Sequence, residues 1–154
     1  MQEQFSRTAM LLGESAIEKL NNARVAVMGL GGVGGSAAEA LLRAGIGHLL
    51  FVDGDEIDET NINRQLLATD ETVGMDKIKA AEIRFRSINP DADMTFKKEF
   101  YLPENSDFLF ELQPDLILDA IDTVTGKLQL VERAVAVGTP IICSMGTGNK
   151  LDPA

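Results

Sequence analysis

The sequence predicts an α/β protein built on a doubly wound, mainly parallel sheet with helices on both faces. Two observations predict this fold class. Short strand-like runs recur that are apolar throughout rather than alternating, as in parallel strands buried on both faces. Amphipathic helical segments separate these runs, so strand and helix alternate along the chain. Right-handed crossovers between parallel strands then favour a Rossmann-like arrangement.

The first third of the chain carries two strand signals and two helix signals. Apolar residues spaced three apart predict a short amphipathic helix over residues 14–22. The β-branched, apolar run 24–28 ends at a glycine and predicts a buried strand. Good helix formers over 36–44, followed by a closing glycine, predict the next helix. The apolar run 48–52 predicts the second strand, which ends at an aspartate.

The middle of the chain is more polar and its elements are less regular. An acidic loop leads into residues 61–67, where we expect a short helix. A longer helix is predicted over 77–88, because its apolar residues form one stripe and Pro90 prevents continuation. Residues 94–100 alternate weakly between apolar and polar, which predicts a more exposed strand.

The last third of the sequence repeats the alternation of helix and buried strand. We expect a helix over 106–112, a strand over 116–120, a helix over 123–137 and a strand over 141–144. No repeat, linker or low-complexity tract divides the chain, so residues 1–154 are expected to form one domain. An apolar strand at a sheet edge calls for a neighbour, and we therefore expect the natural protein to continue beyond residue 154.

Composition excludes several classes of protein. The single cysteine excludes a disulfide framework and any Cys-x-x-Cys zinc pair within these 154 residues, which favours a reducing compartment such as the cytoplasm. No apolar run approaches the roughly 18 residues of a membrane span. The formal net charge of −10 argues against a nucleic-acid surface spread over the whole domain. The basic stretch from Lys77 to Lys98 is either a solvated helix face or a local contact for nucleic acid.

A glycine-rich motif directly follows the first predicted strand. The run Gly29-Leu30-Gly31-Gly32-Val33-Gly34 satisfies G-x-G-x-x-G between a strand and a helix, the context in which this motif binds dinucleotides or adenine nucleotides. Gly29 permits a tight turn, Gly31 lets the backbone approach a phosphate, and Gly34 lets helix and strand pack closely. The helix N-terminus adds free N–H groups and positive potential. Gly29, Gly31, Gly32 and Gly34 are therefore expected to bind an adenine nucleotide.

Acidic and basic side chains follow at the ends of later strands. Asp53 ends the second predicted strand and is placed to accept hydrogen bonds from a ribose diol. Two cations, Arg64 and Lys77, suit phosphates whose charge changes during a reaction, whereas a nicotinamide cofactor does not require such a clamp. Polar residues lie near them in the sequence: Asp55, Asn61, Asn63 and Gln65.

Asp122 follows the fourth predicted strand, at the edge of the sheet where ligands of such folds bind. Its carboxylate could hold Mg²⁺, which prefers one or two carboxylates together with nucleotide phosphates. The alternative is a helix N-cap, a role that Thr123 could also fill.

Four stretches of this sequence together resemble the ThiF/HesA/MoeB superfamily, relatives of the ubiquitin-activating enzymes, over nearly the whole chain. They are residues 25–34, 52–65, 74–77 and 119–122. The resemblance implies a Rossmann-like domain that binds ATP and Mg²⁺, adenylates a carboxylate and releases pyrophosphate. It makes Asp53 the ribose ligand, Arg64 and Lys77 the phosphate clamps, and Asp122 the acid beside the metal. It also gives Asn61 and Gln65 supporting polar contacts.

The resemblance also bears on assembly. Arg7 matches an arginine that in relatives reaches the nucleotide of the neighbouring subunit, which implies a homodimer. The alternative is a flexible surface residue near a terminus.

Segments outside the glycine motif bear on the branch of the superfamily. Residues 5–14 and 143–153 are similar to the tRNA threonylcarbamoyladenosine dehydratase branch, which implies ATP-dependent activation of the threonyl carboxylate and cyclisation with loss of water. In the second segment Asn149 and Lys150 could present N–H groups and a cation to an anion. Cys143 and His48 are expected to be structural, because neither has a catalytic partner in its sequence neighbourhood.

Three other functions remain open. An adenylyltransferase would act on the C-terminus of a ubiquitin-like sulfur carrier protein. An NAD-binding dehydrogenase would use the glycine motif for a dinucleotide, and a nucleotide-binding scaffold would show no turnover.

Overall fold

A computed structural model describes residues 3–146 and contains one five-stranded parallel sheet in the order β3-β2-β1-β4-β5. All four strand pairings are parallel. The strand order reverses between β1 and β4, which creates the switch point where ligands of open α/β sheets bind. The strands are β1 (Arg24–Met28), β2 (His48–Val52), β3 (Asp93–Lys97), β4 (Leu116–Asp119) and β5 (Ile141–Cys143).

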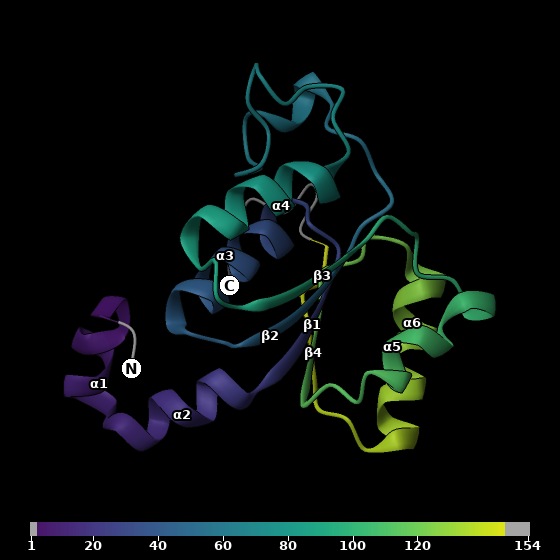
Figure 1. Cartoon of the computed structure of the whole chain (residues 1–154). Coiled ribbons are helices and arrows are strands. Elements are labelled where there is room, and N and C mark those ends of the chain that lie inside the picture. Colours follow the sequence, from purple (N-terminus) through teal and green to yellow (C-terminus); the bar gives the residue numbers. More distant parts are fainter. Residues whose placement is uncertain (1–2, 147–154) are drawn as a thin grey trace, which may run out of the picture.

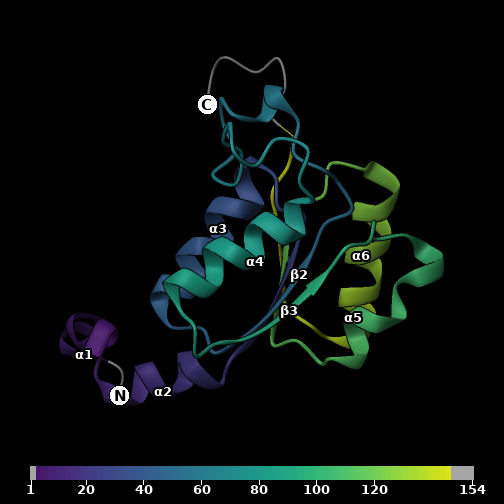
Figure 2. The same ribbon diagram turned by 45° about the horizontal axis from the view of Figure 1, so that its top comes forward.

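Helices cover both faces of the sheet (Figures 1 and 2). One face carries α3 and α4, the other carries α5 and α6, and α1 and α2 extend to one side. This arrangement confirms the predicted doubly wound fold. The helices are α1 (Ser6–Leu12), α2 (Glu14–Asn22), α3 (Gly32–Ala44), α4 (Lys77–Ile88), α5 (Asp107–Glu111) and α6 (Val124–Val137), with single 3-10 turns η1 (Glu3–Phe5), η2 (Glu59–Asn61) and η3 (Pro103–Asn105).

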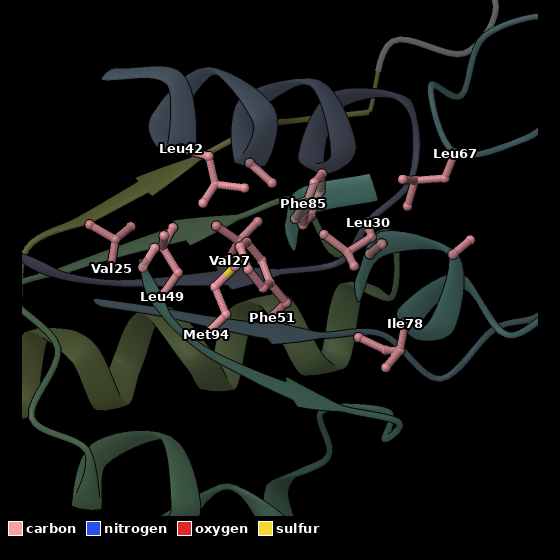
Figure 3. Close-up of a cluster of buried hydrophobic side chains, with 14 of the residues drawn as sticks. Val25, Val27, Leu30, Leu42, Leu49, Phe51, Leu67, Ile78, Phe85 and Met94 are labelled. Carbon is pink, nitrogen blue, oxygen red and sulfur yellow. The ribbon is translucent and has the colours of Figure 1, made fainter. Parts of the chain in front are cut away.

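Two apolar clusters fill the space between the sheet and its helical layers. Successive strand residues point to opposite faces, so Val27 joins the cluster under α3 and α4, whereas Met28 joins the cluster under α5 and α6. The first cluster is shown in Figure 3, where Phe51 of β2 and Phe85 of α4 have ring centroids 4.9 Å apart. Both rings are fully buried, which fixes α4 against the sheet.

Backbone hydrogen bonds bring the carboxyl ends of three strands to the same edge. Gly29 N–H donates to the carbonyl of Val52 at 2.8 Å, and Ala120 N–H donates to the carbonyl of Met28 at 2.8 Å. The residues that follow β1, β2 and β4 therefore meet at one place. These are the segments in which the sequence concentrates its glycines and charged side chains.

Two of the predicted helices need correction. The helix expected at 36–44 begins at Gly32, four residues earlier. Glycine has a poor helix propensity, but the first turn of this helix packs too closely on the backbone at Gly29 for a Cβ at Gly34. The helix expected at 61–67 is wrong: η2 ends at Asn61 and turns follow it. The Asn61 side chain accepts the N–H of Asp58 at 3.0 Å and closes a single capped turn there.

Other differences are smaller. The expected strand 94–100 is β3 at 93–97, and α1 was not predicted. The elements predicted at 116–120, 123–137 and 141–144 differ by one residue at one end, and the helix predicted at 106–112 is one residue shorter at each end.

Candidate functional site

The glycine turn between β1 and α3 is shaped by two close backbone approaches. Gly29 has φ +90°, and a Cβ there would lie 2.7 Å from the carbonyl oxygen of Ala120. A Cβ at Gly34 would lie 1.8 Å from the carbonyl oxygen of Gly29. Within residues 3–146, a Cβ at Gly31 would meet a single atom within 4 Å, Gln65 Nε2 at 3.8 Å. The turn is therefore closed towards the sheet and open at Gly31.

The N-terminus of α3 opens at this turn. Gly31 is the N-cap residue, and no side chain of residues 3–146 caps the helix there. The first N–H groups of a 13-residue helix therefore remain available, together with the positive end of its dipole. This combination favours an anion such as a phosphate.

Asp53 links the end of β2 to the glycine turn. Its Oδ2 accepts the N–H of Leu30 at 2.6 Å, and its Oδ1 accepts the N–H of Asp55 at 2.8 Å. Burial raises the pKa of the Asp53 carboxyl, although these two hydrogen bonds and the Lys77 charge act in the opposite direction. Each carboxylate oxygen retains acceptor capacity, so Asp53 can still accept a hydroxyl group.

Lys77 is a buried cation at the first residue of α4. Its Nζ lies 3.0 Å from Asp55 Oδ2, and its N–H donates to the carbonyl of Asp55 at 3.0 Å. A cation at a helix N-terminus opposes the helix dipole, and burial adds a desolvation cost. Asp55 offsets part of this cost. Such a placement is expected where an anion binds.

Arg64 and Gln65 lie over the opening of the turn. A Cβ at Gly32 would lie 3.8 Å from Arg64 Cγ, so this side chain passes close to the start of α3. The exposed guanidinium Nη1 donates to the carbonyl of Thr60 at 2.9 Å and to Asn63 Oδ1 at 2.8 Å. Gln65 Oε1 is buried and has no hydrogen-bond partner among residues 3–146, which is unusual unless a ligand supplies one.

Asp122 follows β4 in the loop that leads to α6. Its side chain is exposed, and it makes no hydrogen bond or ion pair within the described range 3–146. Thr123 is the N-cap residue of α6 but makes no side-chain capping bond. No group of three or more His, Cys, Asp or Glu residues that could hold a metal occurs in that range. A cation here would therefore need ligands from elsewhere, such as nucleotide phosphates.

A buried ion pair beside Asp122 was not predicted from the sequence. Asp119, at the end of β4, is fully buried, and its Oδ2 lies 2.6 Å from Lys127 Nζ. The sequence signal was weak: an acidic residue ending an apolar strand, with a lysine eight positions later on the next helix. Cys143 lies against Asp119, and burial together with that carboxylate raises the pKa of the thiol. This supports the structural role expected for Cys143.

Two predicted features lie away from this site or outside the described residues. Arg7 is exposed on α1. Two residues earlier, the Phe5 ring would lie 3.3 to 3.4 Å from a Cβ at Gly45. Gly45 follows the C-terminus of α3, roughly 20 Å along the helix from the glycine turn at its N-terminus. The fold does not bring Arg7 to the site of its own chain. Asn149 and Lys150 lie outside the described residues.

The basic stretch 77–98 is largely neutralised by ion pairs. Such pairing favours a solvated helix face over a surface prepared for phosphates. The pairs beyond Lys77 are Lys79 with Glu82, Arg84 with Glu39, Arg86 with Glu82, Lys97 with Glu99 and Lys98 with Asp76.

His48 is the first residue of β2, and its Nδ1 lies 3.3 Å from Asp93 Oδ2. This agrees with the expected position at the start of a strand. No helix within residues 3–146 is long and apolar enough to cross a membrane.

Comparison with known proteins identifies the family. The sequence profile described as the ThiF family matches residues 5–151, almost the whole chain. The chain belongs to the ThiF family. Among ThiF-like relatives, the tRNA threonylcarbamoyladenosine dehydratase of Bacillus subtilis (strain 168) is 43% identical over 99% of this chain and 60% of the relative. The sulfur carrier protein ThiS adenylyltransferase of the same strain is 36% identical over 97% of this chain and 45% of the relative.

Solved structures of a ThiF-like enzyme share the fold. The structure of E. coli tRNA N6-threonylcarbamoyladenosine dehydratase, TcdA, in complex with AMP has a TM-score of 0.93 and 36% sequence identity, covering 98% of this chain and 61% of that chain. Its complex with ATP gives the same TM-score. The present chain thus spans about 60% of the length of these two dehydratases and 45% of the ThiS adenylyltransferase.

Proposed function

We propose that this ThiF-family domain binds ATP and uses it to activate the threonyl carboxylate of threonylcarbamoyladenosine in tRNA, which then cyclises with loss of water. The observation that carries the proposal is the pairing of an open, glycine-lined helix N-terminus with a buried lysine at the same edge of the sheet. The high identity to tRNA threonylcarbamoyladenosine dehydratases supports this choice of acceptor.

In this proposal each part of the nucleotide meets a different element. The backbone at Gly31 and Gly32 and the N-terminus of α3 face the phosphates. Asp53 accepts hydrogen bonds from the ribose diol. The hydrogen bond that Asp53 accepts from the Leu30 N–H keeps this carboxylate close to the glycine turn. Gln65 supplies to the same ligand its amide oxygen, which has no hydrogen-bond partner within residues 3–146. Asn61 acts indirectly, by closing the turn that precedes Arg64.

The charges account for the chemistry. A substrate carboxylate oxygen forms a bond to the α-phosphorus, the bond to the β-phosphate oxygen breaks, and pyrophosphate leaves. An intramolecular attack on the activated carbonyl then expels AMP, so that one water is lost overall. Lys77 and Arg64 lower the repulsion between the two anions and stabilise the charge that develops on pyrophosphate. Arg64 leaves its contacts with Thr60 and Asn63 when it turns towards the phosphates.

A magnesium ion fits this site as a companion of ATP. Asp122 presents to the solvent an exposed carboxylate that has no partner within residues 3–146, and one carboxylate with nucleotide phosphates is a common environment for Mg²⁺. When bound, the ion would supply positive charge to the phosphates. Asp122 would hold and orient it.

The assembly and location belong to the same proposal. Arg7 reaches the nucleotide of a partner subunit in a homodimer, which is compatible with its exposure and with its distance from the site of its own chain. The exposed apolar residues of α1, Met10 and Leu11, give this helix a surface to bury in such a dimer. ATP and tRNA are both present in the cytoplasm, where we place this protein.

A sulfur carrier protein is the second candidate acceptor. It is favoured by the 36% identity to a ThiS adenylyltransferase over 97% of this chain. That reaction would use the same ATP contacts and would differ in the carboxylate presented. An NAD-dependent dehydrogenase is disfavoured, because Lys77 and Arg64 would have no chemical task beside a hydride carrier.

The nucleotide assignment is tested with the full-length protein by calorimetric titration of ATP and NAD. We expect ATP to bind and NAD not to bind, and Lys77→Ala and Arg64→Ala each to weaken ATP binding. Preferential NAD binding, or ATP binding that neither substitution changes, would contradict the phosphate clamp. ATP binding without AMP formation from either carboxylate acceptor would indicate a scaffold.

A further inference from the structure

The most deeply buried charge of the described fold lies next to the proposed site and has no part in the proposed chemistry. Asp119 is fully buried at the end of β4. Its partner Lys127, in the first turns of α6, donates from Nζ to Asp119 Oδ2 at 2.6 Å and to the carbonyl oxygen of Ser144 at 2.9 Å. One ammonium group therefore joins α6 to the carboxyl ends of β4 and β5.

The second oxygen of Asp119 holds the loop that carries Asp122. Asp119 Oδ1 accepts the N–H of Ile121 at 3.0 Å. On its other side the loop rests on the glycine turn, since a Cβ at Gly29 would lie 2.7 Å from the carbonyl oxygen of Ala120. Asp122 is thus the exposed end of a short loop. Its first residues are held on one side by Asp119 and on the other by the glycine turn.

We infer that Lys127 is a positioning residue that sets the orientation of Asp122 relative to the glycine turn; this inference rests on the proposed function. Without the ammonium group, an ionised Asp119 would be buried with no counter-charge, which is strongly unfavourable. The carboxylate would have to turn towards water or take up a proton. Either change alters its bond to Ile121 N–H, one residue before Asp122.

The size of the effect follows from geometry. The Lys127 ammonium group is held by Asp119 Oδ2 and the carbonyl oxygen of Ser144, and neither it nor these two groups are proposed to contact ATP, so we expect its loss to remove no contact with the nucleotide. A displacement of about 1 Å in a group that orients the reacting phosphates costs on the order of 10²-fold in rate. The predicted signature is therefore a fall in kcat with little change in the affinity for ATP.

The test uses the full-length protein and variants at Lys127, with a control variant on the same helix. Lys127→Met removes the ammonium group but keeps the aliphatic stem, and Lys127→Arg restores a cation. Lys127→Gln, which keeps a donor, replaces Lys127→Met if the latter does not fold. The matched control is Arg133→Met, which removes an ion pair of the same helix with Asp107 at 2.8 Å, at the far end from the site.

Three quantities are measured for each variant: the rate of AMP formation at saturating ATP, the dissociation constant of ATP, and amide hydrogen exchange over residues 119–123. For Lys127→Met we expect AMP formation to fall on the order of 10²-fold, ATP affinity to change less than about threefold, and exchange in the loop to accelerate. Lys127→Arg should recover part of the rate. Arg133→Met should retain the wild-type rate and loop exchange.

A double-mutant cycle with Asp122→Asn separates positioning from general destabilisation. If Lys127 acts through Asp122, adding Lys127→Met to Asp122→Asn lowers the rate by less than about threefold further. Full multiplication of the two losses, a wild-type rate in Lys127→Met, or an equal loss in Arg133→Met would overturn the inference. A wild-type protein that forms no AMP would instead overturn the proposed function, while hydrogen exchange would still report on the loop.

Discussion

Replacing Gly31 by alanine separates nucleotide binding from folding. Among the described residues, a Cβ at this position would meet only Gln65 Nε2 within 4 Å, at 3.8 Å, which is ordinary van der Waals contact. The backbone at Gly31 is extended, with φ −69° and ψ −156°, and its negative φ is compatible with an L side chain. Because the change also reduces the entropy of the unfolded chain, we expect the free energy of unfolding of the variant to stay within about 1 kcal/mol of the wild type.

The added methyl group would enter the open side of the turn, where the account places a phosphate. Inserting one methyl group into a filled site typically costs about 1–3 kcal/mol. At 1.4 kcal/mol for each factor of ten, this predicts a dissociation constant for ATP that is about 5- to 150-fold higher. The loss is expected in binding, with no matching loss in stability.

Calorimetric titration of ATP and thermal unfolding, measured on the same preparations, test this prediction. The matched comparison is Gly34→Ala, whose Cβ would lie 1.8 Å from the carbonyl oxygen of Gly29, where ordinary contact begins at 3.4 Å. That variant must move the backbone of the turn, so it should lose stability as well as binding. Wild-type ATP affinity in a folded Gly31→Ala protein would refute the assignment of the turn to the phosphates.

Three further predictions concern other parts of the molecule. Lys77→Met should lower AMP formation on the order of 10²–10³-fold in steady-state assays, because a charge that stabilises pyrophosphate is lost; a rate within a factor of about two of wild type would contradict this. Phe85→Ala should cost about 3–5 kcal/mol in urea unfolding, since the ring is fully buried against Phe51, and a loss below about 1 kcal/mol would contradict the packing. The hydrogen bond from Arg84 holds the pKa of the Glu39 carboxyl below its ordinary value, so ionised Glu39 stabilises the fold above the pKa of the unfolded chain, and this contribution is lost as the pH falls through the pKa of the folded state. Glu39→Gln should therefore be about 1 kcal/mol less stable than wild type at neutral pH, and this difference should shrink as the pH becomes acidic, as measured by unfolding over a series of pH values; a difference independent of pH would refute the role of the ion pair.

The sequence predicts most of the fold because its parallel strands carry complete local signals. The runs 24–28 and 48–52 and the helix 77–88 have the predicted bounds, since each shows an apolar pattern and a clear terminating residue. The prediction fails where tertiary contacts decide. Gly32 begins α3 because Gly34 must pack on Gly29, and Asn61 ends its turn because its side chain is recruited by Asp58.

The candidate site was predictable to the extent that its residues follow strands. In a parallel sheet the carboxyl ends of the strands share one edge, so Asp53 and Asp122 could be placed there from the sequence. The Lys127 ion pair depends on the register of β4 against β5, where Asp119 pairs with Cys143, and on the return path of α6. No local pattern specifies this register. The role expected for Arg7 requires a second chain, so the fold of a single chain does not test it.

The most direct test of the proposed function follows the tRNA nucleoside itself. The full-length protein is incubated with ATP, Mg²⁺ and tRNA that bears threonylcarbamoyladenosine, and the digested nucleosides are analysed by mass spectrometry while AMP is quantified. We predict that the modified nucleoside loses one water and that the loss depends on ATP and is matched by AMP formation. An unchanged nucleoside, from protein shown to be folded and to bind ATP, would contradict the proposed acceptor and direct attention to the sulfur carrier proteins.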